Sequence, residues 1–355
     1  MALTDPPKFE TVLVMQGGGS LGAFECGVYK ALERRGIKFD IVSGTSIGAI
    51  NAGIVAGAKA NPAQTLEDFW LNIAETFTPV ALPHQLRSAT AWMYGAVWGN
   101  PRVFSPTWHN SLGCMYGSPH LYDLSPLKKT VANYIDFEKL APGHSPRLIV
   151  TSTDIQRSES VLFDSHRERI AADHLVACAG FPFYGISWTK INGHYLWDGS
   201  LMSNTPLREV IAASPQNDKR VYIVNLFPKN QQELPENLSD SWHRARDIMH
   251  TDRTDHNIQM SRVIKRYLKL LHEMHDLLKA VPLDERSKDR FAKMEMEYNK
   301  LADQRGAIIE EVIKIERKED VPFLFEDADF SIATIKELIK QGEVEAERVL
   351  KERVG

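Results

Sequence analysis

The segment Gly44-Thr45-Ser46-Ile47-Gly48 constrains the fold of this chain most, because it fits the pattern G-x-S-x-G at a predicted change from strand to helix. The apolar run 41–43 precedes it and the apolar run 47–57 follows it. Glycines two residues to either side of the serine avoid collisions with neighbouring backbone, and the turn lifts the hydroxyl above the sheet at a helix N-terminus. The pattern predicts Ser46 as a nucleophile. A plain glycine-rich turn, in which the serine only begins a helix, stays open as the alternative.

A second glycine-rich turn, Gly17-Gly18-Gly19-Ser20-Leu21-Gly22, directly follows the first apolar run at 11–15. Such a loop can aim several backbone N–H groups at one point, as an oxyanion hole requires. Its glycines also fit the dinucleotide pattern G-x-G-x-x-G, but that reading expects an acidic residue at the end of the second strand, and Asp40 instead precedes that strand. We therefore favour an oxyanion hole. Its candidate donors are the backbone N–H groups of Gly17, Gly18, Gly19, Ser20 and Ile47.

Strand, glycine loop and helix alternate twice at the start of the chain, which is typical of a parallel α/β sheet. The carboxyl ends of parallel strands share one edge, so the two glycine-rich turns can face one another. Further strands are expected at 147–153, 160–163, 195–197 and 221–226, with a helix at 207–213. The segment 79–124 is expected to be irregular. For its aromatic side chains, core packing is favoured over an acyl pocket or a lid.

The nucleophile needs a base, and its early position is unlike the common α/β-hydrolases, in which the serine follows several strands and a histidine comes last. Asp198 stands at the end of a predicted strand and is followed by Gly199, so it can point toward the same edge as Ser46. Desolvation there would raise its pKa toward the working pH. Two alternatives stay open: Asp198 only supports its own turn, or it orients His166 or His194 in a triad.

Three motifs in this order give the chain its resemblance to the patatin-like phospholipase family, carried by 16–22, 43–51 and 197–206, with 176–183 also similar. The resemblance implies a three-layer α/β/α fold with a mainly parallel central sheet, and a Ser46–Asp198 dyad without histidine. The glycines that carry the family motifs are Gly22, Gly44, Gly48 and Gly199. Gln16, Leu21 and Ser200 depart from the family pattern. At Gln16 many members have an acidic residue and at Leu21 an arginine, so oxyanion stabilisation would rest on backbone N–H groups.

The character of the chain changes after about residue 228, and this suggests two parts. Residues 1–228 are expected to form the catalytic domain, with motifs at 17–22, 44–48 and 198–200. Residues 229–355 are expected to form a mainly helical C-terminal extension. Apolar residues at helical spacing in 237–280 and a helix 332–352 after Ser331 support this, and a strand is expected near 309–315.

Composition excludes several classes of protein. The net charge of −4 and the lack of a long basic run give no support to nucleic-acid binding. Cys26, Cys114 and Cys178 are widely spaced and odd in number, so neither a disulfide framework nor a zinc site is expected. We also find no calcium-loop spacing, and expect no metal and no cofactor. With no signal-peptide pattern and no apolar run of about 20 residues, a cytoplasmic protein is expected, with peripheral membrane contact open.

The sequence thus predicts a serine acyl-hydrolase that cleaves fatty-acyl esters of lipids or phospholipids through an acyl-enzyme. An esterase, thioesterase, transacylase or polyester depolymerase acting on a different acyl substrate would use the same groups and stays open. So do a non-catalytic binding protein with the same fold and, less favoured, a nucleotide-binding protein. The expected partner is a lipid or acyl-ester substrate, and homo-oligomerisation is left open.

Overall fold

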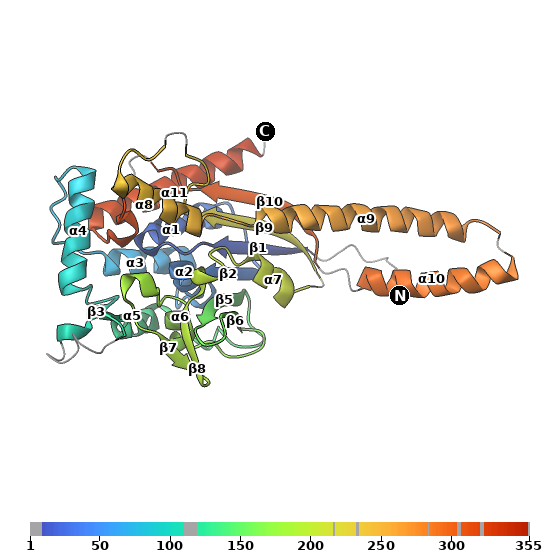
Figure 1. The fold of residues 1–355 in the computed structure, drawn as a ribbon, viewed down its shortest axis with the longest axis horizontal. Coiled ribbons are helices and arrows are strands. Elements are labelled where there is room, and N and C mark those ends of the chain that lie inside the picture. The colour runs from blue at the N-terminus through green and yellow to red at the C-terminus, as the bar shows by residue number, and fades with distance from the viewer. Residues whose placement is uncertain are drawn as a thin grey trace.

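The central element is an eight-stranded sheet, whose strands follow one another from top to bottom in Figure 1. The computed structural model describes residues 9–109, 119–215, 217–231, 234–282, 284–303, 307–319 and 323–353, so Cys114 lies outside the described residues. Five strands run parallel: β10 (Ile309–Glu316), β9 (Asp218–Asn225), β1 (Phe9–Met15), β2 (Ile41–Thr45) and β5 (Arg147–Asp154). Antiparallel strands complete it: β6 (Glu159–Asp164), β8 (His194–Asp198) and β7 (Thr189–Ile191).

Two apolar layers sandwich this sheet because alternate strand residues point to opposite faces. Leu13 and Met15 of β1 belong to one core, and Val12 and Val14 to the other. The first core is covered by α1 (Ala23–Arg34), α2 (Ile47–Gly57), α3 (Pro62–Ile73), α5 (Ser125–Tyr134), α6 (Ala172–Ala177) and α11 (Ile332–Glu352). The second is covered by α7 (Leu207–Ala213) and the start of α9 (Asp255–Lys279). The expected three-layer α/β/α fold with a mainly parallel sheet is confirmed.

Strand β5 brings the ends of β2 and β8 together. Along one side of β5, β2 pairs in parallel up to Thr45 opposite Thr151, while β8 pairs in antiparallel fashion from Asp198 opposite Ser152. The other side of β5 is occupied by β6 over 149–154. The two strands therefore meet head-on at consecutive residues of β5. The residue that follows Thr45 is placed beside Asp198 by sheet register alone.

The segment 79–124 is less irregular than expected, because it contains the helix α4 (His84–Trp98) and a small ribbon of β3 (Ser105–Pro106) and β4 (Tyr122–Asp123). The buried residues of α4 are Arg87, Ser88 and Ala91, while Met93 and Trp98 are exposed. The hydrophobic pattern on which helix prediction depends is therefore inverted here, because the polar face of α4 packs against the protein.

The C-terminal region is partly built into the sheet. Its helices α8 (Leu238–His250), α9 and α10 (Glu285–Asp303) match the expected helical character, and α9 and α10 form a hairpin that projects from the body (Figure 1). However, β10 extends the sheet beside β9, and α11 lies on α1. The boundary proposed at residue 228 thus does not separate two cores. Within the described ranges, no helix is both long and apolar enough to cross a membrane.

Helices α1 and α11 cross at backbone contact through one glycine on each. A Cβ added to Gly27 would lie 1.9 Å from the carbonyl oxygen of Ile339, and one added to Gly342 would lie 2.0 Å from the carbonyl oxygen of Phe24. Such distances leave no room for any side chain, so the two glycines set the spacing of the helices.

We predict that Gly342→Val lowers the free energy of unfolding by about 1–3 kcal/mol or more, because the added side chain pushes α11 away from α1. Urea unfolding followed by circular dichroism measures the change. Lys340→Ala, on the exposed side of the same helix, is the matched control and should change stability by less than about 0.5 kcal/mol. Equal stability of Gly342→Val and the wild type would show that the crossing is not close in solution.

Candidate active site

Ser46 lies in a strained turn between β2 and α2. Its backbone has φ 55° and ψ −128°, in the left-handed half of conformational space that side chains rarely adopt. A Cβ at Gly44 would lie 2.1 Å from the carbonyl oxygen of Gly48, and one at Gly48 would lie 2.5 Å from that of Met15. The glycines at both flanking positions are therefore sterically required. Strain of this kind typically marks a functional site.

Asp198 is fully buried at the end of β8. One carboxylate oxygen, Oδ1, accepts a hydrogen bond of 2.8 Å from the backbone N–H of Ser200. The other, Oδ2, is buried without a regular hydrogen-bond partner among the described residues. Burial raises the pKa of Asp198 to about 6, although the nearby Ser46 hydroxyl and the Ser200 N–H favour the charged form. A carboxyl group with this pKa can accept and return a proton near neutrality.

The glycine-rich loop passes directly over Ser46. A Cβ added to Gly17 would lie 2.8 Å from Ser46 Cβ and 2.5 Å from Asn204 Oδ1. Asn204 secures the loop, since its Nδ2 donates to the carbonyl oxygen of Gly17 at 3.1 Å. The loop then enters the short 3₁₀ helix Gly19–Gly22, whose first N–H groups have no acceptor inside the helix. Free N–H groups near a serine hydroxyl can stabilise a negative charge that develops there.

Gln16 fixes the start of this loop with all of its side-chain hydrogen-bonding groups. Its Oε1 accepts from the N–H groups of Leu226 and Phe227 at 2.7 and 3.2 Å. Its Nε2 donates to Thr205 Oγ1 at 3.0 Å and to the carbonyl oxygen of His250 at 2.9 Å. An ionised acidic side chain here could not donate the hydrogen bond to the carbonyl oxygen of His250, so the amide of Gln16 suits this arrangement.

A cavity of about 440 Å³ opens above Ser46, within the size range of ligand pockets. Its walls come from the glycine-rich loop, α4, the segment 121–127, the segment 179–186 and the C-terminal segment 325–330. Most of these side chains are apolar; they include Trp92, Phe104, Leu124, Phe181 and Phe330. Trp92 and Phe104 thus line a cavity, and the expectation that the aromatic side chains of 79–124 pack only in the core is wrong for them.

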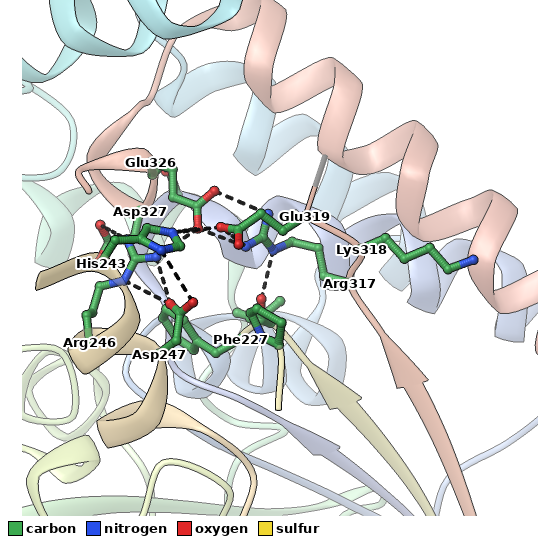
Figure 2. A network of polar contacts seen from close by, with 12 residues as sticks. Phe227, His243, Arg246, Asp247, Arg317, Lys318, Glu319, Glu326 and Asp327 are labelled. Atoms are coloured by element: carbon green, nitrogen blue, oxygen red, sulfur yellow. Dashed lines mark hydrogen bonds and ion pairs between the residues drawn. The ribbon is translucent and has the colours of Figure 1, made fainter. Parts of the chain in front are cut away.

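A buried network of charges supports the cavity wall formed by the C-terminal segment (Figure 2). Arg246 of α8 contacts Glu326 at 2.9 Å and Asp327 at 3.3 Å, and Arg317 contacts Glu326 at 2.8 Å. Although burial opposes it, hydrogen bonds with Glu319 and Glu326 raise the pKa of His243 to about 9, so the ring is protonated near neutrality. Removing one member would leave a buried charge uncompensated.

This network reaches the glycine-rich loop through the backbone of Glu326 and Asp327. Ser20 Oγ donates to the carbonyl oxygen of Glu326 at 2.9 Å. A Cβ added to Gly19, which has φ 54°, would lie 2.1 Å from the carbonyl oxygen of Asp327. The Asp327 side chain also accepts a hydrogen bond from Tyr184 in the cavity wall at 2.7 Å. The loop is therefore held between Asn204 on one side and the C-terminal segment on the other.

His243, Glu319 and Glu326 also bring donor atoms within 4.8 Å of one another, which is the spacing of a metal site. Two arginines already contact Glu326. Although burial raises its pKa, Arg317 and His243 hold the pKa of Glu326 well below its usual range, so its negative charge is compensated without a metal ion. The donor set is thus part of an ion-pair network, and we assign no metal to it.

The structure gathers the candidate residues from distant parts of the chain. Ser46, Ile47 and the loop 17–19 line one cavity, while Asp198 is buried where β2 and β8 meet on β5. The two alternative histidines do not join them. His194 Nδ1 pairs with Asp154 at 2.6 Å at the far end of β8, and His166 Nε2 lies 3.2 Å from the carbonyl oxygen of His144.

Three polar residues at the cavity escaped the sequence analysis: Asn204, His250 and Asp327. Asn204 lies within the motif-bearing segment 197–206, so its place in that motif was the available signal. His250 ends a helix and Asp327 lies in a short 3₁₀ turn, and nothing near either in the sequence suggests chemistry. Burial lowers the pKa of His250, whose ring lies 5.4 Å from that of Phe181 and 5.2 Å from that of Phe227.

Comparison with known proteins gives two matches to family profiles. The profile described as "Patatin-like phospholipase" matches residues 13–211, which include the serine turn, the glycine-rich loop and Asp198. A second profile, described as "Patatin phospholipase", matches residues 248–354. Together they cover both the sheet-forming motifs and the projecting hairpin with β10 and α11.

Individual relatives are similar over smaller shares. A lysophospholipase nte1 of Aspergillus terreus is 54% identical over 44 residues, which are 12% of this chain and 3% of that protein. A patatin-like phospholipase domain-containing protein of Caenorhabditis elegans is 27% identical over 196 residues, 55% of this chain and 12% of that protein. The chain therefore spans only a small part of these relatives. The crystal structure of VipD from Legionella pneumophila aligns with 97% of this chain and 67% of that one, at 14% identity and a TM-score of 0.37, too low to support an argument.

We predict that Asp198→Asn stabilises the protein at high pH. Because the carboxyl pKa is raised from 3.8 to about 6 in the folded state, its ionisation opposes folding fully above about pH 6 and hardly at all below pH 3.8. The free energy of unfolding should rise by roughly 2–3 kcal/mol at pH 8 and by less than about 1 kcal/mol at pH 4.

Urea unfolding at the two pH values measures this difference, with Asp289→Asn on the exposed face of α10 as the control. A gain that is the same at both pH values would mean that the carboxyl group is not perturbed.

Proposed function

The chain belongs to the patatin-like phospholipase family, and we propose that it hydrolyses fatty-acyl esters, with Ser46 as nucleophile and Asp198 as the base. The observation that carries this proposal is the placement of a strained, helix-capping serine beside a buried carboxyl group whose pKa is about 6. Ser46 opens into an apolar cavity under a glycine-rich loop, and Asp198 is fully buried. Serine, base, oxyanion donors and an acyl-sized pocket are the parts that acyl transfer requires.

The reaction proceeds in two steps. Ser46 Oγ attacks the ester carbonyl carbon while Asp198 Oδ2, which has no other regular hydrogen-bond partner in the described part of the chain, takes the hydroxyl proton. The tetrahedral intermediate collapses, the carbon–oxygen bond to the alcohol breaks, and the alcohol leaves with the proton from Asp198. Water then attacks the acyl-enzyme and gives a proton to Asp198. The second collapse releases the fatty acid, and Ser46 Oγ recovers the proton.

Backbone N–H groups stabilise the oxyanion in this scheme. Gly18, Gly19 and Ser20 supply the N–H groups of the first turn of a 3₁₀ helix, and Ile47 supplies one from the start of α2. Leu21 is buried and apolar, so no side-chain cation at that position takes part. Each such donor contributes about 2.7–4 kcal/mol to a transition state of this type.

The lining of the cavity favours an acyl chain as the bound group. Among the described lining residues none is a lysine or arginine, and Asp327 is the acidic one. An anionic headgroup would find no cation inside the cavity, so a phospholipid would leave its phosphate outside. The same observation supports a second candidate function, hydrolysis of an uncharged acyl ester such as a simple ester or a polyester, by the same residues.

We predict that Ser46→Ala and Asp198→Asn each lower kcat/KM for p-nitrophenyl esters by at least about 10³-fold, because they remove the nucleophile and its base. Assays with acyl chains of increasing length on folded protein measure this and rank the substrates. Ser287→Ala and Asp289→Asn, both on the exposed hairpin, are matched controls and should keep wild-type rates. Retention of most activity by Asp198→Asn would assign the base to another residue.

The pH dependence of the rate provides a separate prediction. Because Asp198 must be ionised to accept the proton, kcat/KM should fall tenfold per pH unit below about pH 6 and reach a plateau above it. Stopped assays from pH 4.5 to 8.5 measure the profile. A midpoint near pH 4, which is the ordinary value for a carboxyl group, would contradict the proposed buried base.

A further inference from the structure

A second cavity, of about 510 Å³, adjoins the cavity above Ser46. Helix α4, on the left side of Figure 1, borders both of them: Trp92 lines the first cavity and Ala91 lines the second. Residues that line two cavities at once form the wall between them, and we call this wall the partition. Its members are Gly95, Phe104, Ala328 and Phe330.

The ring of Phe104 closes the partition opposite Gly95. Outside its own helix, the one described atom within 4 Å of a Cβ added to Gly95 would be Phe104 Cζ, at 3.7 Å. The ring packs edge-on against Tyr122 with ring centroids 5.3 Å apart, and the Phe104 side chain is only partly buried. A side chain passes from one rotamer to another without any movement of the backbone. Rotation of this one ring therefore connects the two cavities.

The polar side chains in the wall of the second cavity are engaged in local hydrogen bonds. Asn100 Nδ2 donates to the carbonyl oxygen of Ile73 at 2.8 Å, and its Oδ1 accepts from the N–H of Arg102 at 3.0 Å. Glu75 Oε2 accepts from two backbone N–H groups at 2.7 and 3.1 Å, while its Oε1 is buried rather than exposed to the cavity. Arg102 Nη1 donates to a backbone carbonyl oxygen. Apart from one threonine, the other described wall residues are apolar, aromatic or glycine, so the second cavity suits an apolar ligand.

A long acyl chain is an apolar ligand that reaches this place from Ser46. The first carbons of the chain lie in the first cavity, because Ser46 lines it, and the later carbons extend away from the ester. Each methylene group that leaves water strengthens binding about fourfold, which is equivalent to about 0.8 kcal/mol. Phe104 stands across the path into the second cavity, so the position of its ring determines how many carbons are buried.

We propose that the second cavity receives the distal end of a long fatty-acyl chain, and that Phe104 is the residue that determines the preferred chain length. This inference rests on the proposed function, because the ester bound at Ser46 is what places the chain in the first cavity. It goes beyond that function by naming a second binding site and the side chain that controls access to it.

Opening the partition is the first test. Phe104→Ala should raise the ratio of kcat/KM for p-nitrophenyl palmitate to kcat/KM for p-nitrophenyl butanoate at least tenfold, since about two additional buried methylene groups suffice at fourfold each. Phe9→Ala is the matched control, because Phe9 is 53% exposed at the start of β1 and lines neither cavity. It should keep the wild-type ratio. Phe104→Leu, a milder change, should shift the ratio in the same direction if the alanine variant is unstable.

Narrowing the partition should have the opposite effect. Gly95→Leu fills the space opposite Phe104 and should lower the same ratio at least threefold, and replacing a glycine inside a helix favours folding of α4. Thr90→Leu, on the exposed face of the same helix, is the control and should leave the ratio unchanged.

A third variant tests whether the chain enters the second cavity or only gains room in the first. Ala91 lines the second cavity alone, so Ala91→Met partly fills it. Added to Phe104→Ala, this substitution should cancel most of the gain for palmitate. A gain that survives Ala91→Met, or a Phe104→Ala variant that is accelerated equally on both esters or on neither, would overturn the proposal.

Fatty-acid binding separates this inference from the proposed reaction. Titration calorimetry on Ser46→Ala, with and without Phe104→Ala, measures the affinity for fatty acids of increasing length without any turnover. A wild type that hydrolyses no ester, together with a chain-length preference in binding that Phe104→Ala shifts to longer acids, would reject the reaction and support the second cavity. Ester hydrolysis that requires Ser46 and has a chain-length profile insensitive to Phe104→Ala would reject the second cavity alone. Neither hydrolysis nor fatty-acid binding would reject both.

Discussion

The pairing of two strands along one side of β5 is the constraint on which the candidate site depends. Because Thr45 lies opposite Thr151 and Asp198 opposite Ser152, the serine turn and the acidic turn meet without a long connecting loop. Gly199 packs so closely on Thr151 that a Cβ would lie 2.4 Å from its carbonyl oxygen. The sheet therefore supplies a rigid support for both groups, and burial at this junction is also what raises the pKa of Asp198.

The C-terminal region takes part in the same arrangement. Helix α11 crosses α1 at backbone contact, β10 extends the sheet, and the segment between them backs the glycine-rich loop. Arg246 and Arg317 hold that segment in place through Glu326. Charges are buried here at a considerable desolvation cost. Their effect is to fix the backbone against which Gly19 and Ser20 rest, so the body and the C-terminal region form one packed structure here.

Much of the fold and of the candidate site was predictable from the sequence, because local sequence patterns indicate it. The glycines around Ser46 mark the turn, and the helices 47–57, 207–213 and 332–352 follow from periodicity and boundaries. Long-range packing was not predictable. Helix α4 buries polar residues, so its hydrophobic pattern does not indicate which face packs against the protein. His250 and Asp327 are far from Ser46 in the sequence, and only the fold brings them to the cavity. The assignment of Ser46 and Asp198 to the reaction remains a prediction, supported by their geometry.

Trapping of the acyl-enzyme is the most direct test of the central claim that Ser46 carries the acyl group. The protein would be treated with a long-chain alkyl fluorophosphonate, or quenched in acid during turnover of a p-nitrophenyl ester, and digested for peptide mass spectrometry. The account predicts a single stoichiometric adduct on Ser46, absent from Ser46→Ala and slow to form in Asp198→Asn. An adduct on another residue, or steady ester turnover without any adduct on Ser46, would contradict it.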